Sequence, residues 1–297
     1  MNSQPLVSVV MVNRNNGRFL DKAIESVVGQ TWPRWELIVI EDASEDDSWD
    51  IVQAWMKWES RIRAVRLRQR VNIPAARNAA LARVRGTYVA TLDSDDVWLS
   101  EHLSKELEFM EAPENSGVGV CGTNVWLINE NGRVTGAKRF PQTHEQCIRS
   151  LWWRNPFCHS ATLMRRGCLM QCGEYDETFE VAQDLELWLR IGRVFTFHNL
   201  DEYLVKYRVW PGNVTAQKHR TMVRHTLRAR RLAAIQYGYR TGMRERFALT
   251  ATWLALWLTP RLARKIFEKC VTGQHSRSDG IPDPPEVSEI EASIRIP

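Results

Sequence analysis

Short apolar runs alternate with amphipathic segments through roughly the first hundred residues, and this alternation constrains the fold more than any other feature of the sequence. The runs typical of strands are 7–11, 35–40, 62–67 and 88–92, and the arginines within 62–67 predict that this strand is exposed on one face. Helical spacing of apolar residues fills the intervals at 19–28, 46–58 and 74–83, the last of which begins at a proline. Strands that alternate with helices predict an α/β fold with a parallel sheet covered on both faces.

The second half of the chain has a less regular pattern. We predict a strand over 119–128 that leads into an Asn131-Gly132 turn, a strand over 160–165 and a compact helix over 185–191. Residues 218–270 are rich in Arg and Trp and have the pattern of helices, whereas the polar, proline-containing residues after Gly273 are typical of disorder. The predicted domains are 1–215, with a donor half over about 1–100 and an acceptor half over about 101–215, then a basic helical extension over 216–272 and a disordered tail over 273–297.

Charge and cysteine content narrow the class of protein. The net charge is +5, and the positive residues are crowded into 218–265. Such a surface suits nucleic acid, anionic lipid or phosphorylated substrates, but no nucleic-acid-binding module accompanies it, so we expect no nucleic-acid partner. The six cysteines form no CxxC pair, and no window resembles a secretory signal. We therefore expect reduced thiols and a cytoplasmic protein.

Two acidic turns follow predicted strands. Asp42 comes after the strand that ends at Ile40, and Asp93-Ser94-Asp95-Asp96 follows the strand that ends at Leu92. In parallel sheets, ligands bind beyond the carboxyl ends of the strands. Carboxylates suit Mg²⁺ or Mn²⁺, which is commonly held by one or two of them together with substrate phosphates. The alternative is a solvated acidic turn or a helix cap.

The ordered set of motifs resembles the family-2 inverting glycosyltransferases, which have the GT-A fold: a mixed, mostly parallel nucleotide-binding sheet flanked by helices. The resemblance covers roughly residues 6–210, and a helical C-terminal extension would follow. The pieces that carry it are Val7-Ser8-Val9-Val10-Met11, Ala23-Ile24-Glu25-Ser26-Val27, Gln30-Thr31-Trp32, the segment 36–44 that ends in Glu41-Asp42-Ala43-Ser44, Ala76-Arg77-Asn78, Leu92-Asp93-Ser94-Asp95-Asp96 and the segment 183–190 that begins Gln183-Asp184.

The resemblance implies a role for each donor-side residue. Asp42 would contact the base of the nucleotide, and Arg77 would help to hold the nucleotide. Asp93 would lie near the ribose, and Asp95 would coordinate the Mg²⁺ or Mn²⁺ ion that bridges the diphosphate. Arg14 stands where the family usually has an aromatic residue, and its guanidinium could stack on the base instead. The donor would be a nucleoside-diphosphate sugar, with a UDP-sugar favoured.

The family position of the general base falls on Asp184. Because it lies near the predicted start of a helix, we expect the helix dipole to favour its ionised form. The alternatives are that Asp184 only caps the helix, or that Glu186, which is expected to be exposed, serves as the base. The residue before Asp184 is Gln183 instead of the family's usual Glu. His159 could reach a phosphate or the acceptor, although a structural role is favoured.

The sequence thus predicts a metal-dependent inverting glycosyltransferase of cell-surface polysaccharide or glycolipid assembly, acting on a glycan or lipid-linked acceptor. The apolar run from Phe247 to Leu258, which carries Trp253 and Trp257 and is flanked by cations, fits either an interfacial helix on the cytoplasmic face of an anionic membrane or an ordinary packing helix. The alternative functions are a noncatalytic nucleotide-sugar-binding protein and a nucleotidyltransferase. A nucleotidyltransferase is disfavoured because no glycine-rich phosphate loop follows the first strand.

Overall fold

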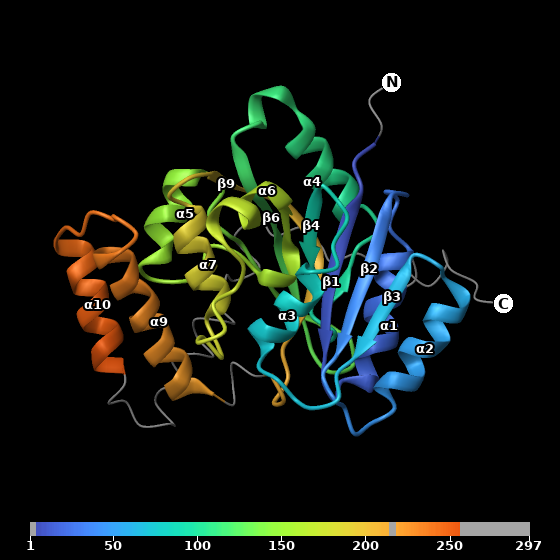
Figure 1. Cartoon of the computed structure of the whole chain (residues 1–297). Helices are drawn as coiled ribbons and strands as arrows, with labels where there is room; N and C mark the ends of the chain where they lie inside the picture. Colours follow the sequence, from blue (N-terminus) through green and yellow to red (C-terminus); the bar gives the residue numbers. More distant parts are fainter. Residues whose placement is uncertain (1–3, 214–217, 256–297) are drawn as a thin grey trace.

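The computed structural model describes residues 4–213 and 218–255, and within them nine strands form one sheet with helices on both faces (Figure 1). The strands are β1 (Val7–Asn13), β2 (Trp35–Glu41), β3 (Ile62–Arg66), β4 (Tyr88–Thr91), β5 (Val97–Trp98), β6 (Val118–Ile128), β7 (Val134–Lys138), β8 (Thr162–Arg165) and β9 (Thr196–Arg208). Their order is β3-β2-β1-β4-β8-β6-β9-β5, and β7 pairs with β6 beside this path. The predicted mixed α/β sheet is confirmed.

The helices follow the predicted positions in the first half and add several elements in the second. They are α1 (Gly17–Val28), α2 (Ser48–Trp58), α3 (Ile73–Leu81), α4 (His102–Glu111), α5 (His144–Leu151), α6 (Arg166–Cys172), α7 (Gln183–Ile191), α9 (His219–Ile235) and α10 (Met243–Ala255), with short 3₁₀ turns at Pro113–Asn115 and His159–Ala161. Helix α3 begins one residue before Pro74. The reason is that the side chain of Asn72 accepts the backbone N–H of Ala75 at 2.9 Å and caps the helix.

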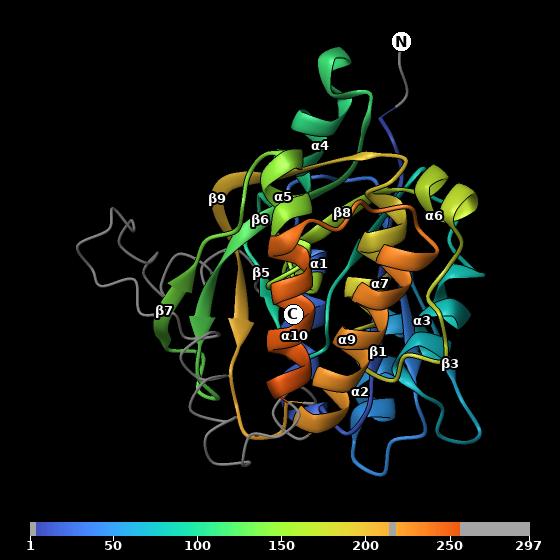
Figure 2. The same ribbon diagram turned by 90° about the vertical axis from the view of Figure 1, so that its left-hand side faces the viewer.

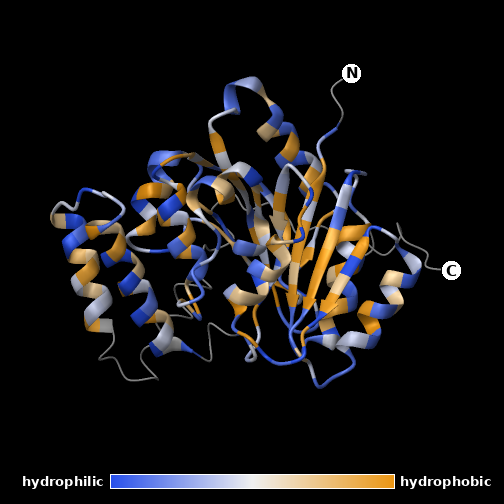
Figure 3. Cartoon of the chain, viewed as in Figure 1, coloured by the Kyte–Doolittle hydropathy of each residue, from blue (hydrophilic) through white to orange (hydrophobic). Residues whose placement is uncertain are grey.

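The central strands are buried on both faces, which explains why they are continuous apolar runs (Figure 3). Successive side chains of a strand point to opposite faces. Val9 and Leu37 therefore belong to the core shared with α1, α2 and α4, whereas Val10 and Ile38 belong to the core shared with α3 and the later helices.

Parallel pairing aligns the strand ends of the first half at one edge of the sheet. Asn13 of β1 pairs with Glu41 of β2, and Val10 pairs with Thr91 of β4. The residues that follow these strands, including Asp42 and Asp93, therefore emerge at the same edge. This is the edge at which ligands of parallel sheets bind.

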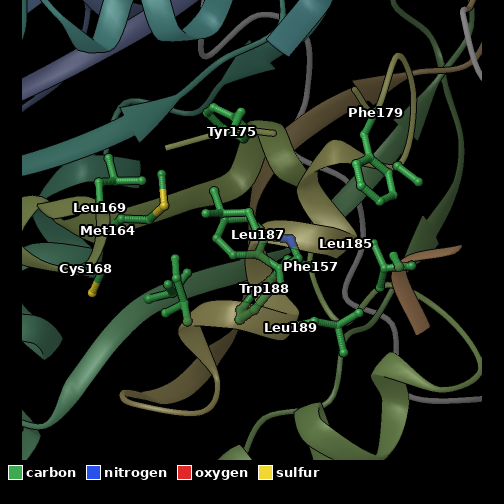
Figure 4. Packing of buried hydrophobic residues seen from close by; sticks show 14 of the residues in the cluster. Phe157, Met164, Cys168, Leu169, Tyr175, Phe179, Leu185, Leu187, Trp188 and Leu189 are labelled. Carbon is green, nitrogen blue, oxygen red and sulfur yellow. The ribbon is translucent and has the colours of Figure 1, made fainter. Parts of the chain in front are cut away.

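Antiparallel strand β8 joins this parallel half to β6 and β9, which are parallel to each other. The predicted Asn131-Gly132 turn connects β6 to β7, with Gly132 at a φ of 78°, where a glycine is favoured. Helix α7 buries its apolar residues in the second-half core. There the ring of Trp188 lies 5.3 Å from that of Phe157, and Leu187 and Leu189 pack nearby (Figure 4).

Helices α9 and α10 lie side by side beyond α7 (Figures 1 and 2). Arg230 of α9 donates to the carbonyl of Leu151 at 3.0 Å and to the hydroxyl of Thr252 in α10 at 2.7 Å. These helices supply the described part of the predicted helical extension. Residues 256–272, Trp257 among them, and the predicted tail over 273–297 lie outside the described residues.

Two further expectations concern membrane crossing and thiols. Across 4–213 and 218–255, no helix has the length and apolar character that crossing a membrane requires. The cysteines in this part of the chain, which exclude Cys270, are all free thiols.

Candidate active site

Three loops next to predicted site residues contain unusual backbone conformations. Asn15 follows β1, Ala43 follows β2, and Ala182 directly precedes α7, and their φ angles are 51°, 50° and 57°. They are the non-glycine residues with positive φ in the part of the chain that the structure describes. Such conformations are costly for residues with a Cβ and cluster at functional sites. All three lie within two residues of a predicted site residue: Arg14, Asp42 and Asp184.

Arg14 and Asp42 link the first two loops. The Arg14 guanidinium donates to the backbone carbonyl of Asp42 at 2.8 Å and to that of Ala43 at 3.2 Å. The Asp42 carboxylate is buried and accepts the backbone N–H of Val71 at 2.8 Å. Burial raises the pKa of Asp42, although the Val71 hydrogen bond and Arg14 act in the opposite direction. The structure thus brings together the two residues that the resemblance places near the base.

A cleft of about 300 Å³ opens beside these loops. Its lining consists of Ala43, Ser44, Arg66, Leu67 and Arg68, from the ends of β2 and β3. Arg66 also pairs with the buried Glu41 at 3.4 Å. A concave site with two arginines next to Asp42 is suited to an anionic ligand that carries a planar ring.

Arg77 forms an ion pair with Asp93. Its buried guanidinium donates from Nη2 to Oδ1 of Asp93 at 2.7 Å. Burial favours the loss of its proton, but Asp93, Tyr175 and Asp184 together raise the pKa of Arg77. Arg77 therefore stays charged, and the charges of the predicted ribose contact and of the predicted base both favour its protonated form.

Asp184 is the second residue of α7, and its side chain is partly buried. Its Oδ2 accepts Nδ2–H of Asn155 at 2.6 Å, and its Oδ1 accepts the backbone N–H of Leu185 at 2.8 Å. The N-cap is Ala182, and it makes no side-chain cap, so Asp184 satisfies one first-turn amide without being the cap residue. The Leu185 amide at the helix start favours the ionised form of Asp184, but it is not the largest effect on the pKa of this carboxyl. Burial raises the pKa of Asp184, and the Leu185 amide and Arg77 only partly offset that effect.

Glu186 does not match the expected exposed carboxylate. Its exposed fraction is 1%, and it forms a two-point ion pair with Arg190 at 2.7 and 2.9 Å. It also accepts the hydroxyl of Tyr237 at 2.6 Å. These contacts attach α7 to the segment between α9 and α10, so Glu186 has a structural role and its carboxylate is already engaged.

His159 lies beneath the site and makes a structural contact. Its Nε2 lies 2.8 Å from the hydroxyl of Tyr175, in a buried hydrogen bond. Burial and the neighbouring Arg77 hold the pKa of His159 well below its usual value. A neutral, buried imidazole supports the structural role that the sequence favoured over phosphate or acceptor contact.

The residues Asp93 to Asp96 gather three carboxylates at the end of β4. Asp95 is largely buried, and burial together with the Asp93 charge raises the pKa of Asp95 to about 6. A divalent cation would relieve this repulsion, and the oxygens of Asp93 and Asp95 are the ligands that Mg²⁺ or Mn²⁺ prefers. Among the described residues, no group of three His, Cys, Asp or Glu side chains is arranged to hold a metal. The donor set therefore fits a cation that completes its coordination with phosphate oxygens and water.

The sequence interpretation missed the segment that covers Asp95. Strand β9 was not predicted, and Arg208 at its end donates to the backbone carbonyl of Asp95 at 2.7 Å. Trp210 and Asn213, in the turn that follows, donate to Oδ2 of Asp95 at 2.8 and 3.2 Å. The available signal was the Pro211-Gly212 pair, which is typical of a turn but does not say what the turn contacts.

Comparison with known proteins identifies the relatives of this chain. The model for the family described as Glycosyl transferase family 2 matches residues 8–172. TuaG of Bacillus subtilis (strain 168), a glycosyltransferase named for teichuronic acid biosynthesis, is 31% identical over 225 residues, which are 73% of this chain and 84% of that protein. WfaP of Escherichia coli, a UDP-Glc:alpha-D-GlcNAc-diphosphoundecaprenol beta-1,3-glucosyltransferase, is 29% identical over 222 residues, which are 74% of this chain and 84% of that protein.

Solved structures share the fold at lower identity. The 1–349 form of S. aureus TarS in complex with UDP-GlcNAc has a TM-score of 0.63 at 18% identity, covering 84% of this chain and 71% of that one. In a longer TarS structure the match spans 46% of the solved chain. The mannosyltransferase PcManGT from Pyrobaculum calidifontis, in complex with GDP-Man and Mn²⁺, has a TM-score of 0.62 at 16% identity. The match covers 93% of this chain and 77% of that one. These likenesses confirm the predicted GT-A-type fold.

Proposed function

The chain belongs to glycosyl transferase family 2, and on that premise we propose that it transfers one sugar from a nucleoside-diphosphate sugar to an acceptor hydroxyl with inversion at the anomeric carbon. The observation that carries the proposal is the Asp93–Arg77–Asp184 arrangement. The buried guanidinium of Arg77 pairs with Asp93 at the end of β4 at 2.7 Å, and the charge of Asp184 on α7 also favours the protonated form of Arg77. A donor on one side of Arg77 and an acceptor on the other would place the sugar between them.

Each residue has a proposed task in this reaction. Asp42 and Arg14 hold the base beside the cleft, and Arg77 and Asp93 fix the ribose and neighbouring phosphate. Asp95, with Asp93, would hold the Mg²⁺ or Mn²⁺ ion, and the ion would stabilise the negative charge of the departing diphosphate. Asp184 takes the proton of the attacking hydroxyl. Its raised pKa makes it a stronger base than an exposed aspartate.

The substrates are proposed from the names of relatives. WfaP is named for a UDP-Glc donor and a diphosphoundecaprenol-linked acceptor, and TuaG for the assembly of a cell-surface polymer. We propose a UDP-sugar donor and a lipid-linked glycan acceptor, within polysaccharide assembly. Family membership favours glycosyl transfer over the nucleotidyl transfer considered above.

Nucleotide binding tests the donor side directly. In a thermal-shift series with Mn²⁺, UDP should raise the midpoint of unfolding more than GDP, because a ligand that binds only the folded state stabilises it. At a concentration about 100 times the Kd, the stabilisation should be about 2.7 kcal/mol. A larger shift with GDP would move the donor to a GDP-sugar, and no shift with any nucleoside diphosphate would contradict the proposed donor site.

Catalysis needs a separate measurement, because binding alone also fits the noncatalytic alternative. Release of UDP from a panel of UDP-sugars, in the presence of a diphosphoundecaprenol-linked sugar, should exceed release without the acceptor. Tight nucleotide binding with no release from any donor would instead support a nucleotide-sugar-binding protein.

We also propose that α10 contacts the surface of an anionic membrane on the cytoplasmic side. Met243, Phe247 and Leu254 are exposed by 89%, 66% and 53%, and the ring of Trp153 lies 6.0 Å from that of Phe247. Exposed arginines flank them at 240, 244 and 246. Apolar side chains among cations match an anionic lipid surface, where a lipid-linked acceptor would be found.

Vesicle sedimentation tests this contact. Wild-type protein should sediment with vesicles of mixed anionic and zwitterionic lipid, and the Phe247→Ser/Leu254→Ser double variant should bind about tenfold less tightly or weaker, since each buried CH₂ contributes about 0.8 kcal/mol. Trp58→Ser is the matched control, because Trp58 is an exposed aromatic on α2 at the opposite end of the molecule (Figure 1). Equal sedimentation of the wild type and the double variant would favour the packing-helix alternative.

A further inference from the structure

Trp210 is fixed against the candidate metal carboxylate by contacts on several sides. Its ring meets that of Phe19 edge-to-face at 5.4 Å, and the Arg18 guanidinium lies 4.2 Å above it. Gly212 lies so close that a Cβ there would be 1.7 Å from the indole, so only glycine allows this packing. The ring is thereby oriented with its N–H directed at Oδ2 of Asp95.

Asn213 completes the arrangement. Its Oδ1 accepts the backbone N–H of Trp210 at 2.7 Å, and its Nδ2 donates to the same Oδ2 of Asp95 at 3.2 Å. Arg208 holds the backbone carbonyl of Asp95, and its backbone N–H donates to Asp96 at 2.7 Å. The end of β9 and its turn thus hold the acidic motif of β4 from a position more than a hundred residues later in the chain.

We infer that Trp210 and Asn213 are positioning residues that hold one oxygen of Asp95 so that the other is presented to the divalent cation. The indole N–H and the amide N–H are donors only, so these two contacts can hold Asp95 but cannot themselves ligate the cation. Hydrogen bonds to a ligating carboxylate fix its orientation, and removing them typically costs about 10–100-fold in metal affinity. The inference rests on the proposed metal role of Asp95.

The alternative is that the two donors compete with the cation for the carboxylate of Asp95 and keep the cation from binding there. The two arrangements predict opposite effects. If Trp210 orients Asp95, removal of its N–H weakens cation binding, whereas removal of a competing donor strengthens it. The packing around Trp210 favours orientation, because the ring is held by Phe19, Arg18 and Gly212 independently of Asp95.

Mn²⁺ binding by electron paramagnetic resonance, with and without UDP, tests the inference on the full chain. Trp210→Phe keeps the aromatic ring and removes only the N–H donor, and we expect its Kd for Mn²⁺ to rise about 10-fold or more. UDP affinity in the absence of metal should stay within twofold of wild type, which a general loss of structure would not allow. Asn213→Ala should weaken Mn²⁺ binding in the same direction.

Trp153→Phe is the control, because the same change on an exposed ring away from Asp95 should leave Mn²⁺ affinity unaltered. Unchanged or tighter Mn²⁺ binding in Trp210→Phe would overturn the positioning role while leaving the proposed function intact. If the wild type itself binds no Mn²⁺ in the presence of UDP, the metal role of Asp95 fails and the inference fails with it.

Discussion

Replacing Asp184 with asparagine should lower kcat by about 10²–10⁴-fold, the usual loss for a missing general base. Asparagine keeps the size of the side chain and can still accept one of the two hydrogen bonds, from Asn155 or from the Leu185 amide, but it cannot take the proton of the acceptor hydroxyl. Nucleotide affinity should change little, because Asp42, Arg77 and Asp95, which are proposed to hold the nucleotide and the metal, are unchanged. Steady-state kinetics and a UDP titration measure the two quantities separately.

The pH dependence of wild-type turnover should also report the ionisation of Asp184. Burial raises the pKa of Asp184. As the pH is lowered, Asp184 is therefore protonated at a higher pH than an exposed aspartate would be. The kcat of the wild type should therefore fall as pH drops through this raised pKa. The residual activity of Asp184→Asn should lack that acidic limb.

Glu186→Gln provides the matched control, since it makes the same carboxylate-to-amide change two residues later in α7. Breaking its buried pair with Arg190 should destabilise the fold, by about 3–5 kcal/mol. At a temperature where the variant is folded, turnover should remain near wild type. A severe loss of kcat in Glu186→Gln with normal activity in Asp184→Asn would move the base to Glu186, and normal activity in both would place it elsewhere.

Asp95→Ala should abolish measurable transfer and Mn²⁺ binding together. The substitution removes a carboxylate from a site where Asp93 is the other candidate ligand, and a cation held by so few protein groups should not tolerate the loss. The fold should persist, because burial and Asp93 disfavour the charge of Asp95 in the metal-free protein. Activity assays, Mn²⁺ titration and thermal unfolding measure the three effects.

Two controls accompany this prediction. Asp50→Asn removes a charge from the exposed face of α2 and should alter neither activity nor Mn²⁺ affinity. Excess chelator should reduce wild-type activity to the level of Asp95→Ala, and added Mn²⁺ should restore only the wild type. Full activity of Asp95→Ala, or of wild type in chelator, would remove the metal from the mechanism.

The sequence by itself determined the elements of the first half and the edge at which the site forms. Residue periodicity encodes strands and helices locally, and parallel strands must end at a common edge, so Asp42 and Asp93 could be placed near each other without coordinates. The motif resemblance then assigned a role to each residue at that edge. The family model confirms the predicted family, and the solved structures confirm the fold.

The tertiary structure alone decided which side chains meet and which are enclosed. The Trp210–Asp95 hydrogen bond joins positions 115 apart in the chain, and the Asn155–Asp184 bond joins positions 29 apart, distances over which local patterns carry no information. Burial is equally nonlocal. Glu186 was expected to be exposed but is covered by Tyr237 from a later segment. Partial burial raises the pKa of Asp184 by more than the Leu185 amide at the helix start lowers it.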